Sequence, residues 1–365
     1  MEKKILFLVS SVGTTGGIQK NLSMISDELI KSGYKVSILS IFKYDQTYYK
    51  FNSKIEMYSC QIKPTKDIKK QFISVYRSTN RMLKKINFDQ LIIEGTGYAT
   101  TVSKNWFLNK DVIVIDHEGL QFHSPFGLSR WGAKISVKYA RAIRLLTNLS
   151  KNEYISAFPK ANAQLITIYN PISNLIQEQK YNVESKKILY VGRLDAEKGI
   201  NYLIDAVGNL KKNDKFDRSW SLDIYGDGDQ KKDIKLKIEE YNLQGQVKLK
   251  GFKNNIHELY SDYSFLVLPS MYESFGLVIV EALKSGIPVV AFDSLYGPKE
   301  IIKNNVNGIL VERKNIGSLS NAIFSLIKSN ELRRYLGSNT QKELERYNIN
   351  QILEQWIAMI ENREA

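Results

Sequence analysis

The sequence predicts an α/β fold made of two doubly wound domains. Short, continuously apolar segments alternate with amphipathic segments along the whole chain of 365 residues. Apolar strands between amphipathic helices are typical of parallel sheets that are covered on both faces. A chain of this length suffices for two domains, each with its own core. We therefore expect two Rossmann-like domains that face a central cleft, where the carboxyl ends of their strands meet.

The first half, residues 1–172, begins with a strand followed by an amphipathic helix over Gly17–Ser32. Leu22, Ile25 and Leu29 recur at helical spacing on one face of this helix, and Gly33 ends it. The strands expected in this half cover Lys4–Ser10, Val36–Ile41, Gln90–Glu94, Val112–Asp116, Arg144–Thr147 and Gln164–Ile168.

The second half, residues 186–347, repeats this alternation after a linker that we place between Asn170 and Ser185. Its expected strands are Lys187–Val191, Ser221–Tyr225, Gln246–Lys250, Phe265–Leu268, Pro288–Phe292 and Gly308–Val311. Its expected helices are Gly199–Leu210, Asp229–Tyr241, Gly276–Ser285 and Gly317–Lys328. A last amphipathic segment, Asn350–Ile360, has its apolar residues on one helical face.

The composition indicates a globular protein of a reducing compartment. Cys60 is the only cysteine, which excludes a disulfide framework, and we expect it to be a half-buried strand residue. The residues before the first strand are too few for a signal peptide, and no stretch approaches the roughly 18 apolar residues of a membrane-spanning helix. We therefore expect a cytoplasmic protein.

The positive charge is concentrated in the first half of the chain. Residues 1–172 carry a net charge of +13, whereas residues 173–365 carry +1. The segment from Lys63 to Lys85 contains eight Lys or Arg residues and one acidic residue, Asp67. Its pattern predicts a basic amphipathic helix with Ile68 and Tyr76 on the apolar face. It either covers the sheet with a solvated basic face or binds an anionic membrane surface. The cleft of a doubly wound fold is poorly suited to recognise a nucleic-acid duplex, so we expect no nucleic-acid partner.

The most informative segment runs from Pro269 to Gly286, where a buried strand passes through a loop into a helix. It carries two carboxylates eight positions apart, Glu273 and Glu281, which can accept hydroxyl groups. The positive helix end and nearby free N–H groups suit an anion such as a diphosphate. These N–H groups belong to Ser274, Phe275, Gly276 and Leu277. An anion cradle between two hydroxyl-binding carboxylates is what a nucleotide-sugar requires.

Two cations are expected beside this segment. Arg193 and Lys198 flank the start of a helix, just after a strand, and a guanidinium and an ammonium group match a diphosphate. Alternatively, they are surface cations paired with Asp195 and Glu197. A glycosidase also uses paired carboxylates, about 5–10 Å apart, but that interpretation leaves both cations without an anionic ligand.

The run from Glu273 to Glu281 resembles the E-x7-E signature of family-4 retaining glycosyltransferases, which have the GT-B fold. Other landmarks of this family follow one another in the expected order, and the resemblance spans nearly the whole chain. These landmarks are Gly16-Gly17, His117, the segment Val191–Gly199, Tyr225-Gly-Asp-Gly228 and Gly251-Phe252. The chain is most similar to bacterial glycosyltransferases of surface-polysaccharide synthesis.

The resemblance implies a role for each of these positions. Arg193 and Lys198 stabilise the leaving diphosphate, Glu273 contacts hydroxyls of the donor sugar, and Glu281 binds the ribose. The remaining roles are phosphate and acceptor contact at Gly16 and Gly17, orientation of the donor sugar by His117, and the nucleobase pocket at Phe252. Tyr296-Gly-Pro-Lys-Glu300 favours a UDP-hexose or UDP-N-acetylhexosamine. A C-terminal helix over residues 348–365 would cross back onto the first domain.

The function expected from these features is that of a metal-independent, retaining glycosyltransferase. It would transfer a hexose or N-acetylhexosamine from a UDP-sugar to a hydroxyl of a glycan or a polyprenyl-diphosphate-linked saccharide, at the inner face of the cell membrane. We expect no cofactor or metal site, because no His/Cys/Asp cluster has metal-ligand spacing. The alternatives are another GT-B enzyme, such as a nucleotide-sugar epimerase or a phosphorylase, and a non-catalytic glycan- or lipid-binding protein.

Overall fold

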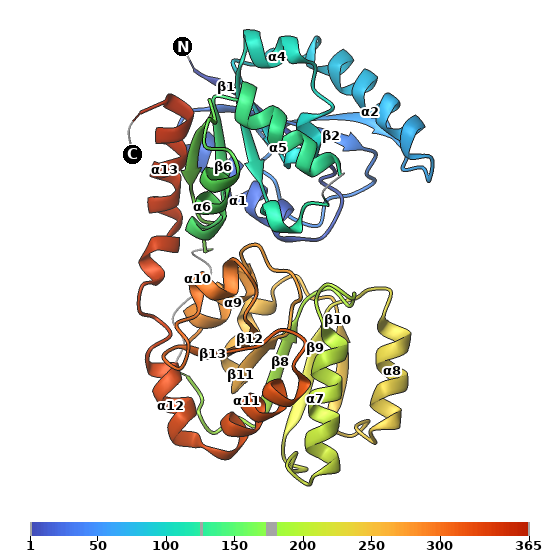
Figure 1. Ribbon diagram of the computed structural model, residues 1–365, viewed down its shortest axis with the longest axis vertical. Coiled ribbons are helices and arrows are strands. Elements are labelled where there is room, and N and C mark those ends of the chain that lie inside the picture. The colour runs from blue at the N-terminus through green and yellow to red at the C-terminus, as the bar shows by residue number, and fades with distance from the viewer. Residues whose placement is uncertain (1, 125–126, 173–180, 364–365) are drawn as a thin grey trace. The chain divides into compact units, whose positions relative to one another are not determined.

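A computed structural model describes residues 2–124, 127–172 and 181–363, and it divides into two compact units. The first unit comprises Met1–Pro171 with Ile349–Ala365, and the second comprises Ile172–Asn348. Each unit has one parallel sheet with helices packed against it (Figure 1). The expected α/β class is therefore confirmed. Most of the expected linker, residues 173–180, lies outside the described residues.

The first unit is built on a seven-stranded sheet in the order β3-β2-β1-β4-β5-β6-β7, with every neighbouring pair parallel. The strands are β1 (Lys4–Val9), β2 (Lys35–Phe42), β3 (Glu56–Ile62), β4 (Gln90–Glu94), β5 (Asp111–Asp116), β6 (Ala142–Leu145) and β7 (Gln164–Thr167). Edge strand β3 was not among the expected strands, because only Cys60 and Ile62 in it are buried and it lacks a continuous apolar run.

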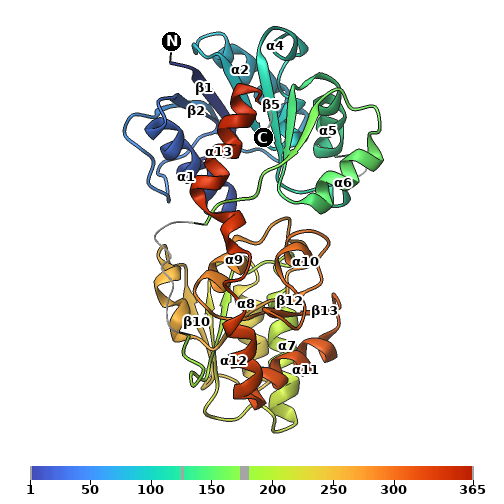
Figure 2. The same cartoon turned by 90° about the vertical axis from the view of Figure 1, so that its left-hand side faces the viewer.

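Helices cover both faces of this sheet, and the side chains of β1 alternate between the two cores. Leu6 and Leu8 join the core under α2, α4 and α5, whereas Phe7 joins the core under α1 and α13. Figure 2 shows α1 and α13 next to each other on one face. The helices are α1 (Gly17–Lys31), α2 (Ile68–Leu83), α3 (Thr96–Ala99), α4 (Lys104–Asn109), α5 (Leu128–Tyr139), α6 (Asn148–Ala157) and α13 (Ile349–Glu361).

The basic segment forms the expected helix, α2, but its expected apolar face is only partly correct. Helix α2 begins after Asp67, whose side chain accepts a hydrogen bond from the backbone N–H of Lys70 at 3.0 Å. Val75 packs into the core, whereas Ile68 and Tyr76, which would face the sheet if the helix only covered it, are 77% and 38% exposed. The helix contacts the sheet along a narrower stripe than the spacing of its apolar residues indicated.

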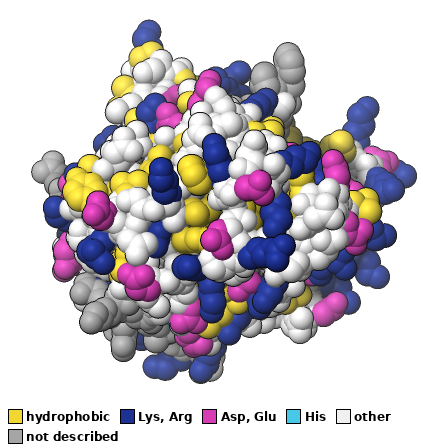
Figure 3. All heavy atoms as spheres, turned by 90° about the horizontal axis from the view of Figure 1, so that it is seen from below, with side chains coloured by type: hydrophobic (Ala, Val, Ile, Leu, Met, Phe, Trp, Pro, Cys, Tyr) yellow, Lys and Arg dark blue, Asp and Glu magenta, His cyan; other side chains and the backbone are white. Residues whose placement is uncertain are grey.

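The second unit is built on a six-stranded parallel sheet in the order β10-β9-β8-β11-β12-β13. The strands are β8 (Lys187–Val191), β9 (Ser221–Tyr225), β10 (Val247–Gly251), β11 (Phe265–Leu268), β12 (Val289–Phe292) and β13 (Gly308–Val311). The helices are α7 (Ile200–Lys212), α8 (Lys231–Glu240), α9 (Leu277–Lys284), α10 (Gly297–Ile301), α11 (Ile316–Lys328) and α12 (Asn330–Ser338). Figure 3 shows cationic and acidic side chains interspersed on the face of the molecule seen from below.

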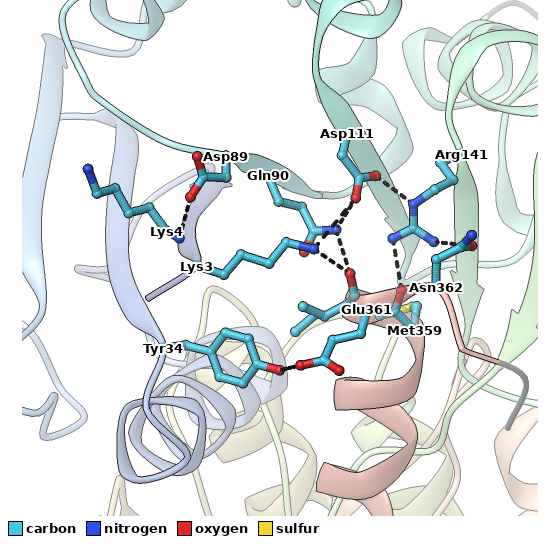
Figure 4. A network of polar contacts seen from close by, with 11 residues as sticks. Lys3, Lys4, Tyr34, Asp89, Gln90, Asp111, Arg141, Met359, Glu361 and Asn362 are labelled. Atoms are coloured by element: carbon cyan, nitrogen blue, oxygen red, sulfur yellow. Dashed lines mark hydrogen bonds and ion pairs between the residues drawn. The ribbon is translucent and has the colours of Figure 1, made fainter. Parts of the chain in front are cut away.

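The C-terminal helix α13 belongs to the first unit, although it follows the second unit in the sequence. Trp356 is fully buried, with its ring centroid 6.1 Å from that of Phe7 in β1. Polar contacts fix the end of the helix (Figure 4). Arg141 donates a hydrogen bond to the carbonyl of Met359 at 2.8 Å, and Tyr34 donates one to Glu361 at 2.5 Å. Both apolar burial and side-chain hydrogen bonds therefore hold α13 on this sheet.

Candidate functional site

The loops that follow β8 and β9 in the second unit lie in close backbone contact. A Cβ atom added to Gly226 would lie 1.8 Å from the carbonyl oxygen of Gly192, and one added to Gly228 would lie 2.4 Å from that of Leu194. Side chains cannot be accommodated at such distances, so glycine is required at both positions. These contacts fix the course of the β8–α7 loop, which carries Arg193 and Lys198.

The same loop also packs against the segment that follows β11. Gly199 has a φ of +66°, and a Cβ atom there would lie 1.9 Å from the carbonyl oxygen of Pro269. The backbone N–H of Met271 donates a hydrogen bond to the carbonyl of Glu197 at 2.8 Å. Two strands that are neighbours in the sheet thus hold their carboxyl-terminal loops together.

This packing pairs the expected leaving-group cation with the expected sugar-binding carboxylate. The ammonium Nζ of Lys198 lies 2.7 Å from Oε2 of Glu273, although the two residues are 75 positions apart. Their side chains are 21% and 12% exposed, so both can be reached by a ligand. An ammonium group and a carboxylate at one point can together bind a phosphate and a hydroxyl group.

The backbone around Glu273 is fixed from the neighbouring loop after β12. Its N–H donates a hydrogen bond to the hydroxyl of Ser294 at 3.1 Å, and its carbonyl accepts one from the N–H of Gly297 at 3.2 Å. A Cβ atom on Gly297 would lie 1.8 Å from the carbonyl oxygen of Phe275. The conformation of the segment from Glu273 to Phe275 is therefore determined before any ligand binds.

Helix α9 begins directly after this segment. Gly276 precedes the helix in the left-handed conformation, with a φ of +88°. The N–H groups of Leu277 and Val278, in the first turn, have no acceptor within the helix, and they lie at its positive end. Ser274, Phe275, Gly276 and Leu277 thus lie between Glu273 and a helix N-terminus, as the sequence indicated, and this arrangement can bind an anion.

Arg193 lies on the more exposed side of the β8–α7 loop. Its guanidinium group lies 3.1 Å from Asp195 and 3.2 Å from Glu197, and its side chain is 57% exposed. The surface ion pairs of the alternative interpretation are therefore present. They do not preclude a phosphate ligand, because exposed ion pairs contribute little stability and exchange readily.

Glu281 and Phe252 occupy different surroundings. Glu281 is only 4% exposed, and Tyr260 donates a hydrogen bond to its Oε2 at 3.2 Å. Burial raises the pKa of the Tyr260 hydroxyl well above its ordinary value, and the charge of Glu281 raises it further. Phe252 follows β10 and is 48% exposed. The sequence did not identify Tyr260, because nothing in its surrounding segment marks it as the partner of Glu281.

In the first unit, Gly16 and Gly17 lie between β1 and α1. Gly17 is the first residue of α1, and the N–H of Gly16 donates a hydrogen bond to the hydroxyl of Tyr49 at 3.3 Å. Gln19 supports the loop by donating a side-chain hydrogen bond to the carbonyl of Ser11 at 2.9 Å. The loop thus has the strand-to-helix position that the sequence indicated.

His117 follows β5, as expected, and its ring contacts a carboxylate that the sequence did not identify. Nε2 of His117 lies 2.5 Å from Oε2 of Glu94, the last residue of the neighbouring strand β4. The two side chains are 7% and 1% exposed. The signal in the sequence that could have identified Glu94 is its position as an acidic residue at the end of the largely apolar segment Gln90–Glu94.

Asp116, beside His117, is the centre of a second buried cluster. It accepts hydrogen bonds from the ring of His123 at 3.2 Å and from the hydroxyl of Tyr154 at 2.6 Å. Burial opposes ionisation of Asp116, but the hydrogen bonds and the charge of His123 outweigh it and lower the carboxyl pKa. Glu118, which follows His117, is 57% exposed on its side chain. The Asp116 cluster fixes the loop that carries His117.

Within the described ranges, no group of three or more His, Cys, Asp or Glu residues could hold a metal ion. In the same ranges, no helix has both the length and the apolar character needed to cross a membrane. The candidate site thus consists of the Lys198–Glu273 pair, Arg193 and the α9 N-terminus in the second unit. Glu281 and Phe252 lie in the same unit, whereas His117, Gly16 and Gly17 lie in the first.

Comparison with known proteins finds similarity to glycosyltransferases. Residues 172–343, almost the whole second unit, match the family model of the glycosyl transferases group 1. An uncharacterized glycosyltransferase of Haemophilus influenzae is 28% identical over 355 residues, which cover 97% of this chain and 99% of that protein. The amylovoran biosynthesis glycosyltransferase AmsD of Erwinia amylovora is 26% identical over 361 residues, with 97% and 98% covered.

Two further matches cover the whole chain. An N-acetyl-D-galactosaminyltransferase of Campylobacter jejuni, named for a saccharide on PP-undecaprenol, is 22% identical over 362 residues, which cover 98% of each protein. The crystal structure of Anabaena HepE in complex with UDP and glucose has a TM-score of 0.77 and 20% identity. The match covers 99% of this chain and 100% of HepE. At this identity the likeness concerns the fold alone.

Proposed function

We propose that this chain is a group 1 glycosyltransferase with the GT-B fold and that it transfers a hexose or N-acetylhexosamine from a UDP-sugar. The transfer proceeds with retention of configuration and without a metal ion. The acceptor is a hydroxyl of a glycan or of a polyprenyl-diphosphate-linked saccharide in bacterial surface-polysaccharide synthesis. The names of the Erwinia and Campylobacter relatives favour such an acceptor. HepE, solved with UDP and glucose, favours UDP.

The observation that carries this proposal is the Lys198–Glu273 pair beside the α9 N-terminus. The 2.7 Å contact places an ammonium group and a carboxylate at one edge of the sheet. The diphosphate of a nucleotide-sugar needs cations and N–H donors, and its sugar needs a hydroxyl acceptor. A glycosidase would use two carboxylates, but Glu281 is buried and hydrogen-bonded to Tyr260. The surroundings of Glu281 thus favour binding over acid–base chemistry.

In the proposed reaction, the bond between the anomeric carbon and the UDP oxygen breaks, and a bond to the acceptor oxygen forms on the same face of the sugar. The acceptor proton passes to the departing phosphate, so no protein base is required. Lys198 and Arg193 stabilise the charge that develops on UDP. Glu273 and His117 orient the sugar. Glu281 binds the ribose, and Phe252 lines the nucleobase pocket.

The decisive experiment measures thermal stabilisation of the purified protein by UDP, GDP, ADP and CDP in EDTA, followed by UDP release from UDP-hexoses and UDP-N-acetylhexosamines with and without saccharide acceptors. We expect a saturable shift with UDP alone and acceptor-dependent UDP release. Glu273→Gln should abolish turnover and retain UDP binding, whereas Glu281→Ala should lose UDP binding. If no nucleotide stabilises the protein, a non-catalytic glycan- or lipid-binding role replaces this proposal.

We further propose that the first unit binds an anionic membrane surface through an α2–α5 surface, which comprises Ile68, Ile73, Tyr76, Leu128 and Trp131. Each of these apolar side chains is at least 38% exposed. Phe72 joins the two helices by stacking on both Tyr76 and Trp131, with ring centroids 6.5 and 6.4 Å apart. The eight Lys and Arg residues between 63 and 85 are all exposed. Apolar side chains framed by cations suit an anionic lipid surface.

Vesicle sedimentation tests this part of the proposal. The protein should bind phosphatidylglycerol vesicles and not phosphatidylcholine vesicles. Reversal of Arg77 and Arg81 on α2 to Glu should weaken binding by on the order of tenfold or more, since each cation near the surface contributes ~1 kcal/mol. Reversal of Lys232 and Lys235, exposed cations on α8, is the matched control. Equal losses in both variants would contradict a specific surface.

A further inference from the structure

Glu94 and His117 form a buried pair at the carboxyl end of the first sheet. Glu94 is the last residue of β4, and His117 directly follows the neighbouring parallel strand β5. In the register of these two strands, Glu94 lies opposite Ile115. Their 2.5 Å contact joins Oε2 of the carboxylate to Nε2 of the ring. Because Glu94 is at a fixed strand position, and not in a loop, it is well suited to fix the orientation of the ring.

The fold makes one other use of this carboxylate, because its charge opposes the lowering of the Arg144 pKa by burial. Within the described residues, its second oxygen, Oε1, is buried and has no hydrogen-bond partner. Burial of a carboxylate is costly unless the group is hydrogen-bonded or paired with a charge. A buried leucine would cover the same sheet edge without that cost. The presence of a carboxylate at this position therefore indicates a role in controlling the His117 ring.

Four other charged or titratable groups surround the pair. Arg144, in the adjacent strand β6, is buried and donates hydrogen bonds to the carbonyls of residues 168 and 169 and to Asn170. Burial lowers the pKa of Arg144 to about 10, and the charge of Glu94 opposes that shift. Asp116 and His123 pair with each other, and Glu118 is largely exposed. Glu94 thus provides the only described hydrogen bond to the ring of His117.

We propose that Glu94 is a positioning residue for sugar transfer, which holds the His117 ring with Nε2–H directed at its carboxylate and thereby leaves Nδ1 for the substrate. A carboxylate can only accept a hydrogen bond, so the ring nitrogen that contacts it must be the donor. This inference rests on the proposed role of His117 in orienting the donor sugar.

The state of the ring can be measured without any assay of transfer. The chain has three histidines, so ¹⁵N NMR of histidine-labelled protein can resolve each ring, with His117→Gln and His123→Gln identifying the signals. We expect a protonated Nε2 on His117 in the wild-type protein and a loss of this preference in Glu94→Leu. A ring protonated at Nδ1 alone, or one unaffected by Glu94→Leu, would overturn the proposal.

Kinetics test the consequence for the reaction. Glu94→Gln should lower kcat by roughly ten- to a hundredfold, because small misplacement of a reacting group has effects of that size. The KM for the UDP-sugar and the affinity for UDP should stay within about threefold, because Glu94 lies in the first unit, whereas the residues proposed to bind the ribose and the nucleobase lie in the second. Glu118→Gln, which removes a neighbouring carboxylate without a hydrogen bond to His117, is the matched control.

A double variant separates positioning from an independent effect. If Glu94 acts through His117, Glu94→Gln should cause no further loss of kcat in a His117→Ala background. Additive losses would contradict the proposal, as would equal losses in Glu118→Gln. A wild-type protein without transferase activity would contradict the proposed function. The NMR result would still decide whether Glu94 sets the state of the His117 ring.

Discussion

The two units hold their candidate site residues in different ways. In the second unit, glycines allow the four loops after β8, β9, β11 and β12 to pack backbone against backbone, and the pair of Lys198 and Glu273 that two of these loops carry is partly exposed. In the first unit, buried side chains make the contacts, and the pair of Glu94 and His117 is almost completely enclosed. The site in the second unit thus has a fixed backbone and accessible side chains. In the first unit, contacts with other buried side chains hold the site residues in place.

This difference indicates a division of roles. A ligand that binds the second unit can exchange the Lys198–Glu273 ion pair for its own phosphate and hydroxyl groups at little cost, because the pair is partly solvated. The Glu94–His117 contact cannot be exchanged so easily, because separating a buried pair leaves an unpaired carboxylate. The second unit is thus suited to bind and release a substrate, and the first to present one ring in a constant orientation.

The largest expected effect comes from breaking the pair in the second unit. Lys198→Ala should lower kcat by roughly 10²–10³-fold, as removal of one preorganised donor to a developing charge does. Lys237→Ala is the matched control, since Lys237 pairs with Asp205 at 2.6 Å with comparable exposure of 31% and 20%. Steady-state rates of UDP release measure both variants. Similar losses would show that the loss of an ion pair, and not the site, is responsible.

The next effect should come from the backbone contacts beneath this pair. Gly297→Ala would place a Cβ atom 1.8 Å from the carbonyl oxygen of Phe275, so the loop must shift. We expect a loss of about 1–3 kcal/mol in stability, the usual cost of overpacking, together with weaker stabilisation by UDP. Gly245→Ala, where the added Cβ meets nothing within 4 Å, is the control. Thermal unfolding with and without UDP measures both, and unchanged UDP stabilisation in Gly297→Ala would contradict a shared loop structure.

The sequence predicted most of the strands well but missed edge strand β3 and several helices. Lys187–Val191, Ser221–Tyr225 and Phe265–Leu268 have the expected bounds because each is rich in apolar residues and is followed directly by a glycine or a proline. Helices α5, α6 and α12 were not predicted, because their buried faces are short and include small or polar residues such as Ser136 and Ser150. A run of apolar residues beside a turn residue is thus what made a segment recognisable, because β13 was predicted with its bounds although only two of its four residues are buried.

The sequence placed the site residues on loops but did not predict which of them make contact. Glu273 and Lys198 were both assigned to a ligand, yet their contact follows from the adjacency of β8 and β11, which only the sheet order establishes. The contact of Glu94 with His117 depends in the same way on β4 and β5. Pairing across a parallel sheet is a tertiary property, because these strands are separated by whole helices.

A smaller effect is expected from loosening the buried cluster beside His117. Burial opposes protonation of His123, but its hydrogen bond with Asp116 and the charges of Asp116 and Glu118 outweigh this and raise the His123 pKa above 6.5. Because the folded pKa is raised, this stabilisation is complete below pH 6.5 and is lost as the pH rises through the folded value.

In His123→Gln, the loss of stability between pH 6 and pH 9 should therefore be smaller than in the wild-type protein, by about 1.5–3 kcal/mol, the value of a hydrogen bond to a charged group. Urea unfolding at the two pH values measures this difference. His257→Gln, a change at a half-buried histidine of the second unit, should retain the wild-type dependence. If His123→Gln lost as much stability between pH 6 and pH 9 as the wild-type protein, the Asp116 cluster would not stabilise the charged ring of His123.

The smallest expected effect on stability comes from Arg193, and it distinguishes the two interpretations of this residue. Its ion pairs with Asp195 and Glu197 are exposed, so Arg193→Ala should change the free energy of unfolding by less than about 0.5 kcal/mol. If Arg193 also binds the diphosphate, the same variant should bind UDP more weakly in calorimetric titration. Arg218→Ala, which removes a cation just before β9, should leave UDP binding unchanged. Unchanged UDP affinity in Arg193→Ala would reduce Arg193 to a surface cation and leave Lys198 and the α9 N-terminus to bind the diphosphate.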